Sequence, residues 1–190
     1  MTQLYLVRHG QTDWNLEGRY QGQTDLPLNA AGRAQAASLS QELAGIPFTA
    51  VYSSDLRRAR ETAEILAAAR GLAVQLDPRL REIGLGVWEG QLFTEIATRY
   101  PVEWAERLRD PLNARPAGGE CVAEVARRAA EAASDIARAH PAGPVLIVSH
   151  GVALATLLCQ ARGRPLAETY QAIPNNSHPE VVTWPPERPA

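Results

Sequence analysis

Two histidines occupy equivalent positions in this sequence, each after a short apolar run and before a glycine. His9 follows LYLVR, and His150 follows VLIVS. Such apolar runs are typical of buried parallel strands, and an open α/β sheet binds its ligand beyond the carboxyl ends of its strands. We therefore expect both imidazoles to lie in one crevice at that edge of the sheet.

Residues beside the two histidines favour an anionic ligand. Arg8 precedes the first histidine, and a guanidinium matches the geometry of phosphate and carboxylate groups. A helix is expected to begin at Gly151, where free N–H groups and the positive end of the dipole suit an anion. Each glycine also lets the backbone approach a ligand closely. Neither histidine has HxH or HExxH spacing or an adjacent third ligand, so we expect no metal site.

The segment SSDLRRARETAE holds three arginines that differ in their neighbours. Arg57 and Arg60 each have a glutamate four residues further on, which is the spacing of helical ion pairs. Arg58 faces Thr62 and has no such partner. We therefore assign Arg58 to the ligand anion and the other two to the helix surface.

The segment LREIGLGVWEG offers two candidate acids. Glu89 precedes a glycine and a helical stretch, which favours a role in a turn or at a helix start. Glu82 precedes a glycine-rich loop and is free to point into the crevice. Spacing alone does not separate the two carboxyls.

The remaining pattern alternates strands with helices. Expected strands cover Leu4–Val7, Thr49–Tyr52, Leu72–Leu76, Val145–Val148 and Val181–Trp184. Expected helices cover 29–43, capped by Asn29, 55–69, capped by Asp55, 120–140 and 152–160. This alternation predicts an α/β fold with a mostly parallel sheet covered on both faces. Residues 1–184 are expected to form a single domain, with a short cap at about 84–119 that holds one helix around Leu92–Tyr100. Residues 185–190 are expected to be a disordered Pro-rich tail.

Composition excludes several classes of function. The 19 basic residues are all arginine and face 21 acidic residues, for a net charge of −2. That balance does not favour a nucleic acid or an anionic membrane as a partner. No apolar run approaches the roughly 18 residues of a membrane span, and the start lacks the features of a signal peptide. Cys121 and Cys159 are far apart and fit reduced thiols, so we expect a cytoplasmic protein, with homodimer formation left open.

Six segments, in order along the chain, resemble the histidine phosphatase family, which includes the cofactor-dependent phosphoglycerate mutases. They are LVRHGQTDWN, GRYQGQTDLPLNAAG, SSDLRRARETA, LREIGLGVWEG, PAGGE and VLIVSHG. The resemblance runs from Leu4 to about Gly163. It implies a three-layer α/β/α sandwich of the phosphoglycerate mutase type and a phosphohistidine intermediate.

The resemblance also assigns roles to individual residues. It makes His9 the nucleophile and Glu82 the general acid, and it requires no metal or organic cofactor. The phosphate and substrate pocket is placed at Arg8, Asn15, Gln21, Gly22, Arg58 and His150. These roles suit the side chains, because a neutral imidazole has a lone pair that attacks phosphorus and fixed donors stabilise the phosphoryl oxygens.

The cap region favours hydrolysis over a mutase reaction. The mutases of this family carry a longer, arginine-bearing cap, whereas the arginines between 90 and 119 include no adjacent pair. The WEG and PAGGE segments look more like the family's small-molecule phosphatases. We expect metal-independent hydrolysis of a small phosphorylated metabolite. The alternatives are a 2,3-bisphosphoglycerate-dependent phosphoglycerate mutase and a non-catalytic phosphate-binding regulatory domain, and the latter predicts a missing nucleophile or acid.

Two departures from the family pattern leave the substrate open. Cys121 stands where the phosphatases usually have serine, and His178 and Pro179 interrupt the expected last strand, which argues for an edge or loop position. The aromatic residues near the expected mouth of the pocket are interpreted as packing residues rather than ligand contacts: Trp14, Tyr20, Trp88, Phe93 and Trp104.

Overall fold

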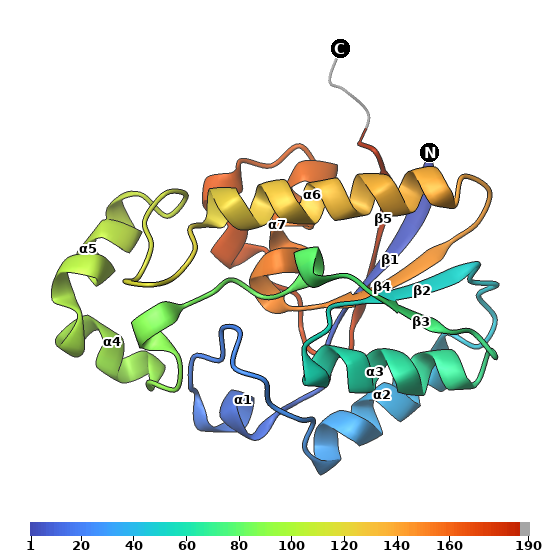
Figure 1. The fold of residues 1–190 in the computed structure, drawn as a ribbon, viewed down its shortest axis with the longest axis horizontal. Coiled ribbons are helices and arrows are strands. Elements are labelled where there is room, and N and C mark those ends of the chain that lie inside the picture. The colour runs from blue at the N-terminus through green and yellow to red at the C-terminus, as the bar shows by residue number, and fades with distance from the viewer. Residues whose placement is uncertain (187–190) are drawn as a thin grey trace.

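The central element is a five-stranded sheet, seen in a computed structural model that describes residues 1–186 (Figure 1). Its strands are β1 (Thr2–Arg8), β2 (Ala50–Ser53), β3 (Val74–Leu76), β4 (Val145–Ser149) and β5 (Pro179–Trp184). Their order is β3-β2-β4-β1-β5, and all neighbours are parallel except β1 and β5. The last four residues of the expected tail, 187–190, lie outside the described residues.

Helices cover both faces of this sheet. They are α1 (Asp13–Glu17), α2 (Ala30–Glu42), α3 (Arg57–Ala68), α4 (Phe93–Arg99), α5 (Pro101–Arg109), α6 (Val122–Ala139) and α7 (Gly151–Ala161). Short 3-10 helices span Pro78–Leu80, Gly86–Trp88 and Leu166–Gln171. In Figure 1, α2 and α3 lie on one side of the sheet and α6 and α7 on the other. The predicted three-layer α/β/α sandwich is confirmed.

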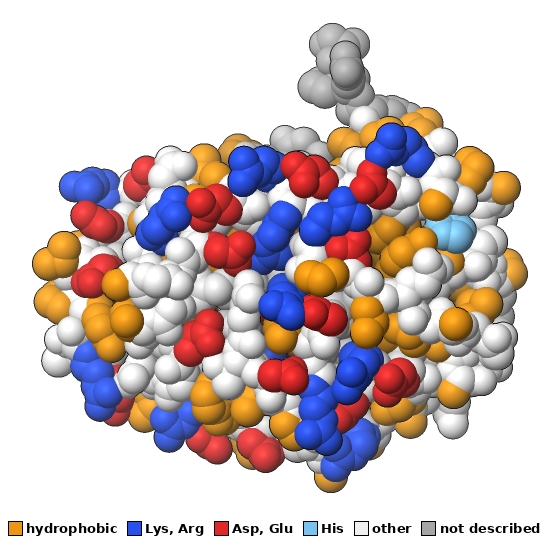
Figure 2. Space-filling view, viewed as in Figure 1, with side chains coloured by type: hydrophobic (Ala, Val, Ile, Leu, Met, Phe, Trp, Pro, Cys, Tyr) orange, Lys and Arg blue, Asp and Glu red, His pale blue; other side chains and the backbone are white. Residues whose placement is uncertain are grey.

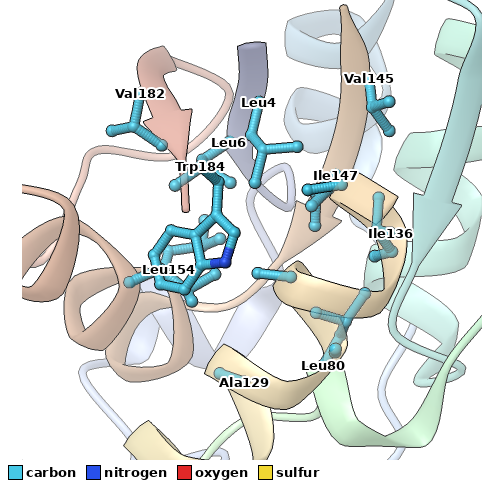
Figure 3. Close-up of a cluster of buried hydrophobic side chains, with 14 of the residues drawn as sticks. Leu4, Leu6, Leu80, Ala129, Ile136, Val145, Ile147, Leu154, Val182 and Trp184 are labelled. Atoms are coloured by element: carbon cyan, nitrogen blue, oxygen red, sulfur yellow. The ribbon is translucent and has the colours of Figure 1, made fainter. Parts of the chain in front are cut away.

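Alternating side chains of the central strand β4 bury both faces. Val145 and Ile147 join a core cluster with α6 and α7, which Figure 3 shows. Leu146 and Val148 join a second cluster with α2 and α3. All four are fully buried, which explains why the strand reads as a continuous apolar run. The packing of this core therefore fixes the position in the sheet at which the neighbouring strands β1 and β4 end.

The start of α3 differs from the expectation. Asp55 does not cap this helix, because the capping position is Leu56 and no side chain closes the helix end. The carboxylate of Asp55 instead accepts hydrogen bonds from Arg81 at 2.7 and 2.5 Å. A two-pronged guanidinium contact satisfies this carboxylate better than one backbone N–H does.

The region between 84 and 119 holds two helices where one was expected. The first, α4, occupies the expected place, and Tyr100 ends it before Pro101 begins α5. Proline suits the first turn of a helix, where its missing N–H costs nothing. Both helices lie together beside the sheet, at the left of Figure 1. The short α1 also went unpredicted, because five residues are too few to show a helical period.

The last strand lies at the edge of the sheet, as Pro179 indicated. His178, just before it, is exposed. On the face drawn in Figure 2, basic and acidic side chains are interspersed. Among the described residues, no helix is long and apolar enough to cross a membrane.

Candidate active site

Parallel pairing of β1 with β4 brings the two histidines together. Arg8 pairs with Ser149 in the register, and the backbone N–H of His9 donates to the carbonyl of Ser149 at 3.0 Å. The rings of His9 and His150 lie with their centroids 5.2 Å apart, and both side chains are buried. The two strands therefore deliver their histidines to the same edge of the sheet, side by side.

Hydrogen bonds to His9 define which ring nitrogen holds the proton. Its Nδ1 lies 2.7 Å from the carbonyl oxygen of Gly10, and a carbonyl only accepts. Its Nε2 lies 3.3 Å from Nε of Arg58, and a guanidinium only donates. The proton is therefore on Nδ1, and the lone pair of Nε2 faces Arg58.

The surroundings keep both imidazoles neutral. Burial, followed by the charges of Arg58 and Arg8, lowers the pKa of His9 well below its usual value. Burial and the charge of Arg58 lower the pKa of His150 in the same way. A neutral imidazole is the nucleophilic form.

Arg58 is fully buried at the start of α3. Its terminal nitrogens donate to the carbonyls of Thr24 and Gly22, each at 2.7 Å. Burial lowers the pKa of Arg58 to about 10, so the side chain is still a cation at neutral pH. The other two arginines of its segment make the surface pairs expected of them, Arg57 with Glu61 at 2.6 Å and Arg60 with Glu64 at 3.7 Å.

Two buried groups beside His9 have polar atoms that no described residue satisfies. Nη1 of Arg8 donates to the carbonyl of Pro174 at 3.0 Å, but its Nε has no partner. Nε2 of His150 bonds to the hydroxyl of Ser54 at 2.8 Å, and its Nδ1 has no partner. Buried polar atoms normally find a partner, so the free Nε of Arg8, a residue of the cavity wall, indicates a binding place for a polar ligand.

Glu82 occupies the start of α7. Its carboxylate accepts N–H groups of Val152 at 3.1 and 3.2 Å and of Ala153 at 3.3 Å. We expected the first turn of this helix to hold a ligand anion, and that expectation was wrong, because a side-chain carboxylate takes these donors. The helix dipole therefore fixes Glu82 beside Gly151.

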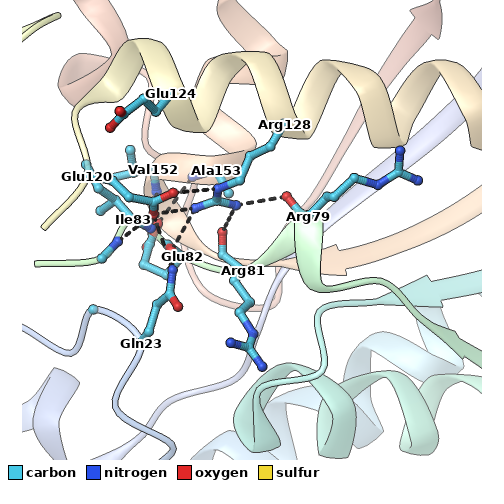
Figure 4. A network of polar contacts seen from close by, with 12 residues as sticks. Gln23, Arg79, Arg81, Glu82, Ile83, Glu120, Glu124, Arg128, Val152 and Ala153 are labelled. Atoms are coloured by element: carbon cyan, nitrogen blue, oxygen red, sulfur yellow. Dashed lines mark hydrogen bonds and ion pairs between the residues drawn. The ribbon is translucent and has the colours of Figure 1, made fainter.

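A second network fixes the main chain that carries Glu82 (Figure 4). Arg128 of α6 donates to the carbonyls of Arg79 at 2.8 Å, Arg81 at 2.5 Å and Glu82 at 2.9 Å. Its remaining donors bind both carboxylate oxygens of Glu120, at 3.0 and 2.9 Å. All five N–H groups of this guanidinium are used, so segment 79–82 has little freedom to move.

The other candidate acid, Glu89, holds a loop together. One of its oxygens accepts the N–H groups of Gln23 at 3.0 Å and Leu85 at 3.1 Å, and the other accepts the hydroxyl of Thr24 at 2.7 Å. A Cβ on Gly22, whose φ is +52°, would lie 2.1 Å from this carboxylate. Glu89 therefore has the turn role that its sequence context favoured, and Glu82 is the carboxyl in the crevice.

Asn15 is oriented by the cap of α1. Its side-chain oxygen accepts from the backbone N–H and the hydroxyl of Thr12, both at 3.1 Å. Because that oxygen is occupied, the amide NH₂ is the end that remains for a ligand.

The predicted residues surround a cavity of about 130 Å³. Those on its wall are Arg8, His9, Asn15, Gln21, Gly22, Arg58, Glu82 and Gly151. His150 is not on the wall and packs beside His9 instead. Gly10 does not approach the cavity as expected, because its close neighbour is the backbone of Gly32.

Sequence reasoning missed further cavity residues. They are Arg19, Ile83, Leu85, Arg107, Val152, Tyr170 and Ile173, joined by Tyr20 and Phe93, which we had assigned to packing. Arg107 has a glutamate four residues before it, which is the pattern of a surface pair, so no local signal marked it. Among residues 1–186, no group of three or more His, Cys, Asp or Glu side chains is placed to hold a metal ion.

Comparisons with known proteins agree with this site. Residues 4–190 match the histidine phosphatase superfamily (branch 1). The probable phosphoglycerate mutase GpmB of Serratia proteamaculans is 41% identical over 166 residues, which are 87% of this chain and 77% of that protein.

Solved structures of similar fold include phosphatases. A mycobacterial glucosyl-3-phosphoglycerate phosphatase has a TM-score of 0.86 at 33% identity, covering 96% of this chain and 91% of its own. The α-ribazole phosphatase of Shigella flexneri also has a TM-score of 0.86, at 28% identity, covering 95% and 89%. The class of protein defined by this fold and site is a phosphoric monoester hydrolase. The chain belongs to the histidine phosphatase superfamily.

Proposed function

We propose that this protein is a metal-independent phosphatase that hydrolyses the phosphate ester of a small metabolite through a phosphorylated His9. The observation that carries the proposal is the state of this imidazole. It is buried and neutral, its Nδ1 proton is bound by Gly10, and its Nε2 lone pair lies among Arg8, Arg58 and His150.

In the first step, Nε2 of His9 attacks phosphorus as the bond from phosphorus to the ester oxygen breaks. A phosphoryl oxygen takes over the Arg58 donor that now makes a long contact of 3.3 Å to Nε2, which frees the lone pair. The leaving alcohol takes a proton from Glu82. A carboxyl fixed beside the ester oxygen is placed to act as the general acid of this step.

In the second step, water attacks the phosphohistidine and the nitrogen–phosphorus bond breaks. Glu82 now accepts a proton from the water, which restores the carboxyl for the next cycle. Inorganic phosphate leaves, and His9 is again neutral. Both steps move one phosphoryl group and one proton, with no electron transfer.

The donors around His9 stabilise the charge that the phosphoryl oxygens carry in both transition states. Arg58 is fixed by two carbonyls and Arg8 by one, so neither side chain needs to reorganise during the reaction. The neutral donors are the NH₂ group of Asn15 and the ring of His150. Preorganised donors of this kind commonly contribute about 10²–10³ each in rate.

The test is turnover of p-nitrophenyl phosphate with excess chelator, combined with quenching in alkaline detergent after brief mixing with phosphorus-labelled substrate. We expect turnover and a protein-bound label that is labile to acid and stable to base. His9→Ala should lose both, whereas His178→Ala, which changes an exposed histidine, should keep both. No release of phosphate from any ester, or an equal label on His9→Ala, would contradict the proposal.

A mutase reaction is the second candidate, and the identity to the probable phosphoglycerate mutases supports it. A mutase returns the phosphoryl group to a second oxygen instead of water. Interconversion of 3- and 2-phosphoglycerate that depends on a bisphosphoglycerate primer, faster than phosphate release, would favour it over hydrolysis.

A further inference from the structure

Four aromatic rings enclose one arginine above the active site. The guanidinium carbon of Arg107, on α5, lies 4.1 Å from the ring centroid of Tyr170. It lies 5.5 Å from the centroid of Trp88 and 5.6 Å from those of Trp104 and Tyr20. We call these four rings the aromatic cage. Because ring faces attract cations, the cage holds the guanidinium in one place.

Most donors of this guanidinium are available to a ligand. Within residues 1–186, its side chain makes one hydrogen bond, from Nη1 to the hydroxyl of Tyr20 at 3.0 Å, and pairs with no carboxylate. A guanidinium has five N–H donors, so one bond leaves most of them free. Arg19, another cation on the cavity wall, already pairs with Glu17 at 2.6 Å.

Arg107 faces the same cavity as His9 and Arg58. Much of the remaining wall is apolar, from Ile83, Leu85, Phe93, Val152 and Ile173. If Arg107 served only to attach the cap to the rest of the protein, its side chain would not need to line the cavity. A substrate bound at His9 would extend its alcohol part along apolar surface within the same cavity.

The charges of the cavity call for a second anionic group. Glu82, on the same wall, is protonated in the first step proposed above, so the two charges of Arg8 and Arg58 beside His9 match one phosphoryl dianion. The positive charge of Arg107 then remains unmatched. A carboxylate supplies the one negative charge that this requires, whereas a second phosphoryl group would add two.

We propose that the alcohol part of the substrate carries a carboxylate and that Arg107, held by the aromatic cage, binds it. This inference rests on the proposed phosphatase function and narrows its substrates to phosphorylated carboxylic acids. Arg107 would be a specificity residue with no part in the bond-breaking steps. Its fixed position lowers the entropy lost on binding, because the side chain is already ordered.

The test compares esters that differ only in charge: 4-carboxyphenyl phosphate with 4-carbamoylphenyl phosphate, and phosphoglycolate with its carboxamide. We expect the wild type to prefer the acid over the amide in at least one pair, by about 10- to 100-fold in kcat/KM, as for one charge-assisted hydrogen-bonded pair. Arg107→Met should reduce that preference to near one. Arg109→Met, which changes an exposed arginine on the same helix outside the cavity wall, should keep it.

The wild-type preference tests the inference even if Arg107→Met does not fold. Tyr20→Phe gives a milder variant, which keeps the ring and removes the hydroxyl that fixes Nη1, and it should give an intermediate preference. Equal kcat/KM for acid and amide in both pairs, or a preference that survives in Arg107→Met, would overturn the inference while phosphatase activity stands. Absence of turnover of p-nitrophenyl phosphate would instead overturn the proposed function.

Discussion

Arg58 donates a hydrogen bond to the imidazole of His9, from Nε to Nε2 at 3.3 Å. The contact is long, and it is made by a fully buried cation whose other nitrogens are held by two carbonyls. Arg58 thus occupies the lone pair of His9 until a phosphoryl oxygen takes over this donor, as in the first step proposed above. It also helps to keep the ring neutral, because its charge lowers the pKa of His9.

Replacement of Arg58 should therefore reduce catalysis far more than replacement of its neighbour Arg57. Arg58→Lys keeps a charge but loses the guanidinium fork, and we expect kcat to fall by about 10²–10³. Arg57→Lys, which changes an exposed residue paired with Glu61, should change kcat less than twofold. Steady-state turnover of one phosphate ester measures both. Equal effects of the two variants would show that Arg58 has no special role.

Arg128 should affect the leaving group through Glu82. Its donors bind the carbonyls of segment 79–82 and the carboxylate of Glu120. We therefore expect Arg128→Lys to displace the carboxyl of Glu82 without altering the residues that bind phosphate. General acid catalysis matters most for poor leaving groups. We expect kcat/KM to fall by about tenfold or more for an alkyl phosphate and much less for p-nitrophenyl phosphate.

The matched control for this experiment is Arg127→Lys, which changes an exposed arginine on the same helix. Glu82→Gln should show the same dependence on the leaving group as Arg128→Lys, only more strongly. If Arg128 had a purely structural role, Arg128→Lys would lower kcat/KM for both substrates by the same factor, and that result would contradict the positioning role.

Local pattern sufficed for the parts of the fold that obey local rules. The apolar runs before His9 and His150 predicted β1 and β4, because a parallel strand that is buried on both faces consists of consecutive apolar residues. Asn29 caps α2 as predicted, with its side chain accepting the N–H of Gly32 at 2.8 Å. The glutamate four residues after Arg57 also predicted its surface ion pair, which Arg57 makes with Glu61.

Other features depend on contacts between distant segments, and the sequence could not show them. Asp55 has the form of a helix cap, but Arg81, 26 residues away, takes its carboxylate. Glu82 lies at the start of α7 only because the 3-10 turn before it and α6 pack together. Arg107 is held at the cavity by three rings from distant segments, those of Tyr20, Trp88 and Tyr170, besides the ring of Trp104 on its own helix.

Gly10 should be required for stability as well as for the orientation of His9. A Cβ at this position would lie 2.4 Å from the carbonyl oxygen of Gly32, a backbone atom that does not move easily. We expect Gly10→Ala to lower the free energy of unfolding by about 1–3 kcal/mol. Gly45→Ala, whose Cβ would meet nothing within 4 Å, should change it by less than about 1 kcal/mol. Urea denaturation measures both, and similar stability of the two variants would contradict the close contact.

The buried histidines should make stability depend on pH in a defined range. Burial, ahead of the nearby arginines, lowers the pKa of His9 and His150 well below the usual value, whereas the unfolded chain titrates near about 6.5. Below that pH the unfolded state binds protons that the folded state does not. The free energy of unfolding should therefore be insensitive to these groups above about pH 6.5 and should fall as the pH drops below it, by up to about 1.4 kcal/mol per pH unit for each histidine.

Urea denaturation of the wild type at pH 7.5, 6.5 and 5.5 measures this dependence. His9→Gln removes one of the two buried histidines. The free energy of unfolding should therefore fall less steeply between pH 6.5 and 5.5, by about the contribution of one histidine. His178→Gln removes an exposed histidine and should keep the wild-type slope. If His9→Gln and the wild type lost stability at the same rate, His9 would be protonated in the folded protein at that pH, and a cationic ring cannot attack phosphorus. The same measurement therefore tests the chemical state on which the proposed reaction depends.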